Sequence, residues 1–267
     1  MEKPNALVLT GYGINCDEET AFAFKKAGAE AKIVHINDLI KEPAMLKKFE
    51  IFAFPGGFSY GDDTGSGNAL ANKIRNNLWD DLLEFIDKEK LVIGICNGFQ
   101  VMTNLGLLPG IGKKYGERTV ALARNNTARY ECRWVSLVNG SEKCVFTRGI
   151  KEIRMPVAHG EGKFTADKKI LKQLDENEQI VFRYAKDGKP AKGEFPFNPN
   201  GAMMDIAGIC DETGRVFGMM PHPERNIFFT QQDDWAMQKE LLKRKGKPLP
   251  EKSDGMKIFR NAIEFFK

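Results

Sequence analysis

The chain is poor in histidine and cysteine for its length. Its 267 residues include three histidines, at positions 35, 159 and 222, and five cysteines, none of them in CxxC spacing. An odd number of cysteines without that spacing argues against a disulfide framework and against a zinc ribbon. Chemistry that joins a thiol to an imidazole therefore has few partners to choose from.

Long apolar runs and concentrated positive charge are also missing. The apolar run at residues 6–9 is too short for the hydrophobic region of a signal peptide, and no stretch approaches the roughly 20 apolar residues that span a bilayer. The net charge of +4 includes no basic run of the kind that neutralises a phosphate backbone. We therefore expect a cytoplasmic protein that binds neither a membrane nor nucleic acid.

Short apolar runs alternate with helical patterns in the first 105 residues. The runs at 6–10, 31–36, 51–54 and 91–95 predict strands, and apolar residues at helical spacing predict helices between and after them. This alternation indicates an α/β fold, with a mostly parallel central sheet and helices on both faces. Ligand sites in such sheets form beyond the carboxyl ends of the strands, where "PGGF" and "CNGF" fall.

The second half of the chain has more strands and fewer helices. A hairpin is predicted around residues 211–214, and the Gly, Pro and Asn content of residues 186–201 predicts a surface loop. No linker is long or polar enough to mark a domain boundary. We expect one domain across residues 1–267, with residues 231–267 as a C-terminal helical extension.

The segment "GICNG" resembles a nucleophile elbow with Cys96 at its apex. Glycines two residues before and after the nucleophile, Gly94 and Gly98, remove side chains that would collide in so sharp a turn. A helix that starts after Cys96 favours the thiolate, and it leaves the N–H of Asn97 free to donate. A small buried cysteine between two packing glycines would give the same pattern, so the hypothesis needs a base.

His222 is the candidate base, held between Pro221 and Pro223 in "MMPHPER". Residues i and i+2 of an extended chain project to the same side, so Glu224 can accept from one imidazole nitrogen while the other faces Cys96. The alternative is a proline-rich turn with a solvated histidine.

The other two histidines are weaker candidates. His35 ends an early strand and could cap the sheet edge. His159, in "HGEGKF", is expected to be a loop residue near the active face, and no metal-ligand spacing accompanies it.

The segment "FPGGFSYGDD" is the third element of the predicted site. Glycines after a strand let the backbone approach a ligand, so the N–H groups of Gly57 and Asn97 could form an oxyanion hole. A plain glycine-rich turn is the alternative. A phosphate loop is disfavoured, because the Lys and Ser/Thr of a Walker motif are missing.

Together these motifs resemble class I, triad-type glutamine amidotransferases, whose architecture is flavodoxin-like. "INCDEET", "PGGFSYGDD", "GICNGFQ", "HGEGKF", "NPNG" and "MMPHPER" are most similar to the glutaminase subunits of phosphoribosylformylglycinamidine synthase. The similarity runs from about residue 11 to residue 226.

The resemblance implies that Cys96 attacks the side-chain amide of L-glutamine, that His222 oriented by Glu224 transfers protons, and that Gly56 and Gln100 contact the substrate. Ammonia would pass to a large ATP-dependent synthetase subunit of the PurL type, which converts formylglycinamide ribonucleotide to the formylglycinamidine in purine biosynthesis. A small PurS-type subunit is expected as well. No cofactor or metal is expected in this chain, since ATP and Mg²⁺ would belong to the partner.

Two other functions stay open at this point. One is a stand-alone Cys-His-Glu hydrolase of the intracellular peptidase or deglycase type. The other is a regulatory binder that keeps the pocket without the chemistry. Co-purification with a large ATP-binding subunit would favour the amidotransferase.

Overall fold

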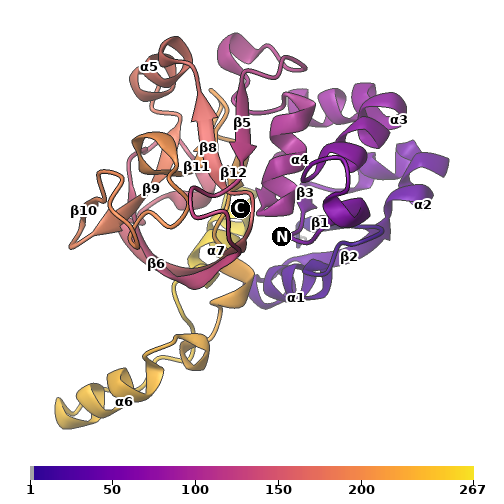
Figure 1. The fold of residues 1–267 in the computed structure, drawn as a ribbon. Helices are drawn as coiled ribbons and strands as arrows, with labels where there is room; N and C mark the ends of the chain where they lie inside the picture. Colours follow the sequence, from indigo (N-terminus) through magenta and orange to yellow (C-terminus); the bar gives the residue numbers. More distant parts are fainter. Residues whose placement is uncertain (1–2) are drawn as a thin grey trace.

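The computed structural model describes residues 3–267, which fold around a ten-stranded sheet (Figure 1). The strand order is β2-β1-β3-β4-β12-β11-β9-β6-β7, with β10 paired to β9, and β5 and β8 form a separate antiparallel pair. The strands are β1 Asn5–Thr10, β2 Glu30–His35, β3 Ile51–Phe54, β4 Leu91–Ile95, β5 Val120–Ala123, β6 Glu131–Asn139, β7 Glu152–His159, β8 Lys163–Ala166, β9 Ile180–Lys186, β10 Lys189–Pro190, β11 Ile206–Cys210 and β12 Val216–Met219.

Helices cover both faces of the sheet. The α-helices of the described residues are α1 Asp17–Ala27, α2 Ile36–Lys41, α3 Asn68–Asp87, α4 Asn97–Leu105, α5 Lys168–Glu176, α6 Trp235–Arg244 and α7 Gly255–Glu264, of which α6 lies away from the sheet. Helix α1 packs with α7, and α3 packs with α4 on the opposite face (Figure 1). Right-handed crossovers explain this division, because β1 to β2 and β3 to β4 step in opposite directions across the sheet.

The half of the sheet that positions the site is parallel. Strands β2, β1, β3, β4 and β12 pair in parallel, while β12, β11, β9, β6 and β7 pair in antiparallel order. Strands β3 and β4 are buried along their whole length, as strands covered on both faces must be. The predicted α/β class is confirmed.

The register of the parallel strands brings three chain segments to one edge. Phe54 pairs with Gly94, and Met219 pairs with Ile95, so β3, β4 and β12 end at nearly the same level. The PGG segment, Cys96 and the segment leading to His222 therefore all begin at this edge.

Two local predictions have different outcomes. Strands β11 and β12 form the predicted hairpin, and the Asp211 carboxylate accepts from the N–H groups of Arg215 and Val216 to hold its turn. The prediction of a surface loop at residues 186–201 is wrong for the last few residues, which are not on the surface. Asn198 and Asn200 are buried because their amides satisfy polar groups inside the protein.

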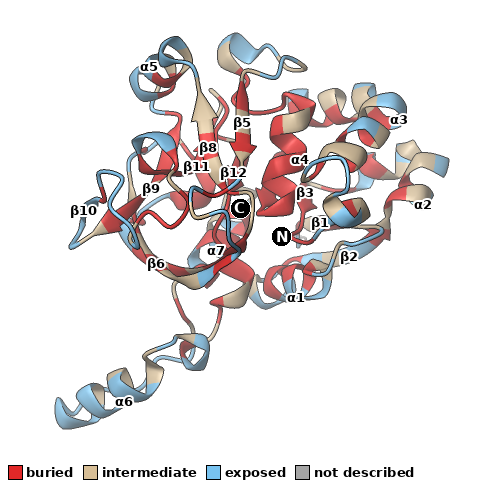
Figure 2. Cartoon of the chain, in the orientation of Figure 1, coloured by how far each residue is buried: buried red, intermediate tan, exposed pale blue. Residues whose placement is uncertain are grey.

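The C-terminal segment divides into two unlike parts. Helix α7 packs into the core, where Phe259 meets Phe24 with ring centroids 4.9 Å apart. Helix α6 has no buried residue and projects from the body (Figure 2). The expected extension at residues 231–267 thus includes one helix that belongs to the core.

None of the helices within residues 3–267 has the length and apolar character that crossing a bilayer requires.

Candidate active site

Cys96 occupies the turn between β4 and α4 in a strained backbone conformation. Its φ of 50° and ψ of −106° lie outside the regions that L-residues ordinarily adopt. A Cβ at Gly98 would lie 1.9 Å from the carbonyl oxygen of Phe54, and one at Gly94 would lie 2.3 Å from Sδ of Met102. The turn is as sharp as an elbow requires, and a side chain at either glycine would collide with its neighbours.

The thiol of Cys96 is almost enclosed. The residue is 5% exposed, and its Sγ lies 3.7 Å from the carbonyl oxygen of Ala158 near the end of β7. Burial raises the pKa of the Tyr130 hydroxyl, and the charge of Cys96 raises it further. The Tyr130 ring is 6.3 Å from that of Phe58, and both rings are largely exposed.

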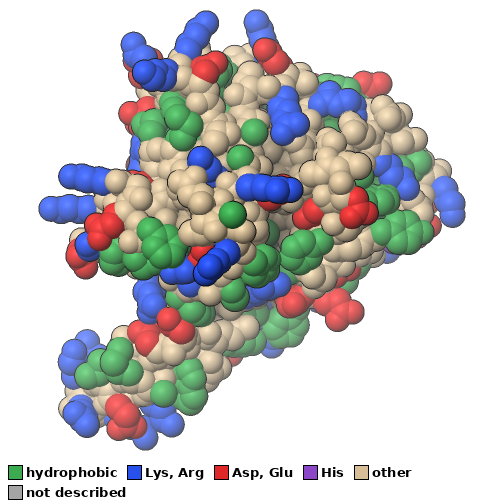
Figure 3. Space-filling model, in the orientation of Figure 1, with side chains coloured by type: hydrophobic (Ala, Val, Ile, Leu, Met, Phe, Trp, Pro, Cys, Tyr) green, Lys and Arg blue, Asp and Glu red, His purple; other side chains and the backbone are tan. Residues whose placement is uncertain are grey.

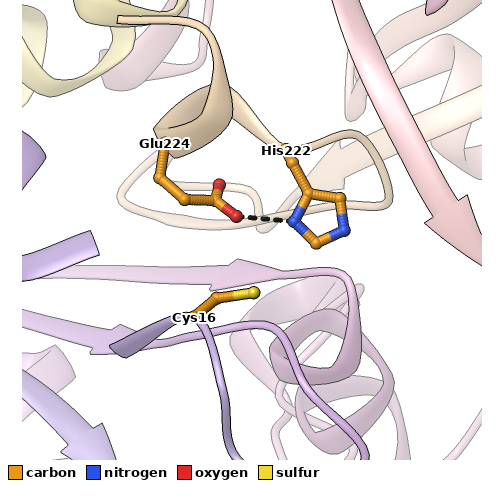
Figure 4. Close-up of side chains that lie close together, drawn as sticks. All are labelled: Cys16, His222 and Glu224. Carbon is orange, nitrogen blue, oxygen red and sulfur yellow. Dashed lines mark hydrogen bonds and ion pairs between the residues drawn. The ribbon is translucent and has the colours of Figure 1, made fainter. Parts of the chain in front are cut away.

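His222 and Glu224 form a buried pair three residues beyond β12. The N–H of His222 donates to the carbonyl of Pro156, and its Nδ1 lies 2.5 Å from Oε1 of Glu224 (Figure 4). Within the described residues, Nε2 of His222 and Oε2 of Glu224 have no hydrogen-bond partner. One ring nitrogen is therefore held by the carboxylate, and the other remains available for proton transfer.

The surroundings of His222 favour its protonated form. Burial alone would lower its pKa, but the Glu224 carboxylate, followed by the thiols of Cys96 and Cys16, outweighs burial and raises the pKa well above its ordinary value. No hydrogen bond joins Cys96 to His222 among the described residues. The fold thus pairs His222 with Glu224, and the participation of Cys96 with them in catalysis stays a prediction.

Cys16 enters the same cluster, which the sequence did not indicate. It precedes α1 and is fully buried, and Nη2 of Arg225 donates to its Sγ at 3.0 Å. Ligand atoms of Cys16, His222 and Glu224 all lie within 4.8 Å of one another. Figure 4 shows the Cys16 sulfur facing the imidazole.

The side chains of this cluster are of the types that bind metal ions, but the distances between their atoms are those of hydrogen bonds. A zinc ion bound to both His222 and Glu224 at about 2.0 Å would hold the nitrogen and oxygen roughly 3.3 Å apart. They are 2.5 Å apart, and the guanidinium of Arg225 lies against Cys16. The arrangement suits a proton and a cationic side chain better than a metal ion.

The PGG loop passes directly against the imidazole. The carbonyl of Gly56 accepts from the N–H groups of Asn15 and Cys16 at 3.3 and 3.2 Å. Because the C=O and N–H of a trans peptide point in opposite directions, the N–H of Gly57 points away from that contact. A Cβ on Gly56 would lie 2.9 Å from Cε1 of His222, so a larger residue would displace the ring.

Asn97 joins the elbow to two loops. It begins α4, so its own N–H has no acceptor within the helix. Its side chain accepts from the N–H of Ser59 and donates to Oε1 of Gln100 and Oδ1 of Asp62. Gln100 in turn donates to the carbonyl of Glu161 at 2.5 Å. Gln100 is thus buried between the elbow helix and the β7–β8 loop.

His159 is not the loop residue that was expected. It ends β7 and is 2% exposed, with Nδ1 3.2 Å from Oδ1 of Asn125 and Nε2 3.5 Å from Nδ2 of Asn200. Burial, and secondarily the charge of His222, lowers its pKa to about 3. His159 is therefore a neutral structural residue beside the site. His35 is also structural, because its Nδ1 accepts from the N–H of Asn37 and caps α2.

Several residues that shape the site were not predicted from the sequence. Cys16, Arg225 and Asn200 stand inside "INCDEET", "MMPHPER" and "NPNG", which is the signal that could have singled them out. Asn125 lies in a segment without a motif, and only the fold brings it to His159.

The sheet, the strained cysteine and the His–Glu pair define an α/β protein with a Cys-His-Glu site of the kind used for covalent catalysis. The family model of the CobB/CobQ-like glutamine amidotransferase domain matches residues 3–266, and the chain belongs to this family.

Its relatives are similar along nearly their whole length. A protein of Methanococcus maripaludis is 58% identical over 265 residues, which are 98% of this chain and 97% of the relative. A protein of Dehalococcoides mccartyi is 45% identical over 266 residues, 99% of this chain and 98% of the relative. Both are named phosphoribosylformylglycinamidine synthase subunit PurQ. Among solved structures, a chain of PurLQS from Thermotoga maritima matches with a TM-score of 0.73 at 29% identity, covering 100% of both chains.

Proposed function

We propose that this chain is the glutaminase subunit of a phosphoribosylformylglycinamidine synthase. It hydrolyses L-glutamine to glutamate and ammonia and delivers the ammonia to an ATP-dependent synthetase subunit, which converts formylglycinamide ribonucleotide to the formylglycinamidine. The observation that carries the proposal is the strained Cys96 beside a buried His222–Glu224 pair. It occurs in a chain 58% identical to a subunit of that synthase.

The first half of the reaction forms a thioester. The Cys96 sulfur attacks the side-chain carbonyl carbon of glutamine, and the carbonyl oxygen becomes an oxyanion that accepts from the N–H groups of Gly57 and Asn97. Protonated His222 gives its proton to the amide nitrogen as the C–N bond breaks. Ammonia leaves, and the γ-glutamyl group remains on Cys96.

The second half restores the thiol. Neutral His222 takes a proton from a water molecule, whose oxygen attacks the thioester carbon. The C–S bond breaks, glutamate leaves, and one water has been consumed for each ammonia released. Glu224 holds the ring through Nδ1 in both halves, so Nε2 is the nitrogen that exchanges protons.

The proposal includes the partners. The large PurL-type subunit supplies the ATP and Mg²⁺ chemistry, and a small PurS-type subunit completes the assembly, as the name of the Thermotoga maritima complex suggests. The cytoplasmic location expected from the sequence is part of the same proposal. A stand-alone peptidase or deglycase is not favoured, because the full-length relatives are synthase subunits.

Substitution of the nucleophile tests the proposal in the complex with its synthetase. Cys96→Ala should abolish glutamine-dependent formation of formylglycinamidine ribonucleotide, while synthesis from ammonium chloride continues at the wild-type rate. Cys132→Ala is the matched control, because Cys132 is exposed and outside the cluster.

A glutamine-mimicking chloroketone supplies the second readout. It should label Cys96 and spare Cys16, although both thiols lie near His222. Glutamine-dependent synthesis by the Cys96→Ala complex, or labelling of Cys16 alone, would contradict the proposed mechanism.

A further inference from the structure

Helix α6 is short for a helix without a buried residue. It has ten residues and projects from the body of the chain (Figure 2). Isolated helices of fewer than about 12–15 residues are marginal in water, and most helices in proteins are stabilised by packing an apolar face. Met237 and Leu241 are 57% and 41% exposed, so apolar surface of α6 is uncovered in the single chain (Figure 3). A second surface that packs on α6 would stabilise the helix.

One side of α6 has the residue spacing of a packing face. The positions i, i+4, i+7, i+8 and i+11 of a helix lie on the same side. In α6 and the two residues that flank it, these positions are Asp234, Gln238, Leu241, Leu242 and Lys245. This face therefore carries a carboxylate at its start, two leucines further along and an ammonium group at its end.

The charges of α6 are segregated along its length. Asp233 and Asp234 precede the helix, and their two carboxylates share the single guanidinium of Arg154. Arg244 and Lys245 stand at the other end, and neither joins an ion pair among the described residues. One end of α6 thus has unpaired negative charge and the other has unpaired positive charge.

We propose that α6 is an interface that pairs with α6 of a second copy of this chain, with the two helices antiparallel. A two-fold axis midway along the helix brings Asp234 of each copy against Lys245 of the other. It also places Met237 opposite Leu242. A two-fold dimer uses the same patch on both copies, so a surface that complements itself in charge is what such a dimer requires. A parallel pair would instead bring like charges together at both ends.

The contact is small, so the dimer is weak. A ten-residue helix is about 15 Å long and about 10 Å wide. Two such helices cover far less than the roughly 1,600 Å² of a standard interface, so we expect a reversible dimer with a Kd above about 1 μM. A subunit of another kind is the alternative occupant. The second copy is favoured because α6 supplies both of the charges that the contact needs. This inference does not rest on the proposed function.

Sedimentation velocity of the full chain between about 5 and 500 μM tests the inference. Wild type should change reversibly from monomer to dimer as its concentration rises. Leu241→Lys should raise the Kd at least roughly tenfold, because it places a charge in the middle of the apolar contact. Circular dichroism should show that the variant folds, since Leu241 is exposed in the single chain.

An exchange of charges tests the antiparallel arrangement. Asp234→Lys and Lys245→Asp should each raise the Kd roughly three- to tenfold, because each brings like charges together at both ends of the contact. The double variant should recover most of the loss. Residues 234 and 245 are about 16 Å apart along one helix, too far to compensate each other within a single chain.

Ile33→Ser is the matched control for the loss of an exposed apolar side chain. Ile33 lies on β2, outside α6, so its replacement should leave the Kd unchanged. Wild type that stays monomeric throughout the concentration range would overturn the inference. Undiminished dimerisation of Leu241→Lys, or a double variant that associates no better than the single ones, would also overturn it.

Discussion

Single residues of this site adopt states that are unfavourable in isolation. The backbone of Cys96 is strained by an amount that is typically about 1–3 kcal/mol. His222 and Glu224 each bury a polar atom without a partner among the described residues. Such groups persist because the surrounding sheet and loops hold them, and here all three lie where the proposed chemistry needs them.

The protonation of His159 makes a testable difference to stability. Its pKa is about 3 in the folded chain and about 6.5 when unfolded, so between these values the unfolded state binds more protons. The contribution of neutral His159 to the free energy of unfolding is fully present above pH 6.5. It falls by up to about 1.4 kcal/mol per pH unit as the pH decreases toward 3. His222 has the opposite effect on stability, because its pKa is raised in the folded chain. Its stabilising contribution is fully present below pH 6.5 and is lost at higher pH.

We expect His159→Gln to be less stable than wild type at pH 7.5, with a difference that shrinks as pH falls from 6.5 to 4.5. Urea denaturation at several pH values measures both curves. The same change at the half-buried His35 controls for the removal of a histidine. Parallel curves for wild type and His159→Gln would show that His159 is not held neutral.

At the scale of elements, the site depends on how closely α4 approaches the strand ends. Gly98 in the first turn of α4 lies against the carbonyl of Phe54 at the end of β3. In an ordinary helix, alanine in place of glycine stabilises by roughly 1 kcal/mol. Here the added Cβ would meet a backbone atom that cannot move without displacing a central strand.

Gly98→Ala should therefore destabilise the protein by about 3 kcal/mol or more, against the usual helical preference. Gly160→Ala is the matched control, since its Cβ would meet nothing within 4 Å, and it should change the free energy of unfolding by less than about 0.5 kcal/mol. Chemical denaturation compares the two. A Gly98→Ala variant as stable as wild type would mean that α4 and β3 do not approach this closely.

At the scale of the whole molecule, the two C-terminal helices have opposite relations to the core. Helix α6 mixes hydrophobic and charged side chains along an exposed rod (Figure 3). The chain leaves and rejoins the body at neighbouring points, because Phe228 pairs with Lys252. The ion pairs of Arg154 with Asp233 and Asp234 are partly exposed, so they contribute little to the free energy of unfolding.

Replacing residues 233–249 with a short glycine linker should leave the free energy of unfolding within about 1 kcal/mol of wild type. Phe259→Ala in α7 should cost about 3–5 kcal/mol, because it empties a fully buried aromatic site. Denaturant unfolding of both variants measures the contrast. A large loss on removing α6 would show that it packs against the body in solution.

Much of the fold and the central site could be predicted from the chain itself. The strands before PGG and Cys96 are short apolar runs, and the elbow needs glycines at positions 94 and 98 whatever the rest of the fold does. The pairing of His222 with Glu224 is also local, since the two residues are only two positions apart in the sequence. Periodicity and sterics of neighbouring residues are enough for such features.

Contacts between distant segments were decided by the tertiary structure alone. Residue 16 meets residue 225 only because the loop after β1 and the turn after β12 end at one sheet edge. His159 is neutral because asparagines from two other segments enclose it, and Glu161 borders a cavity because α4 packs beside its loop. The sequence by itself determined which chemistry was present and where the chain could turn. Which groups share a proton, a cavity or a core was decided by packing, because those energies depend on separations in space that no local pattern encodes.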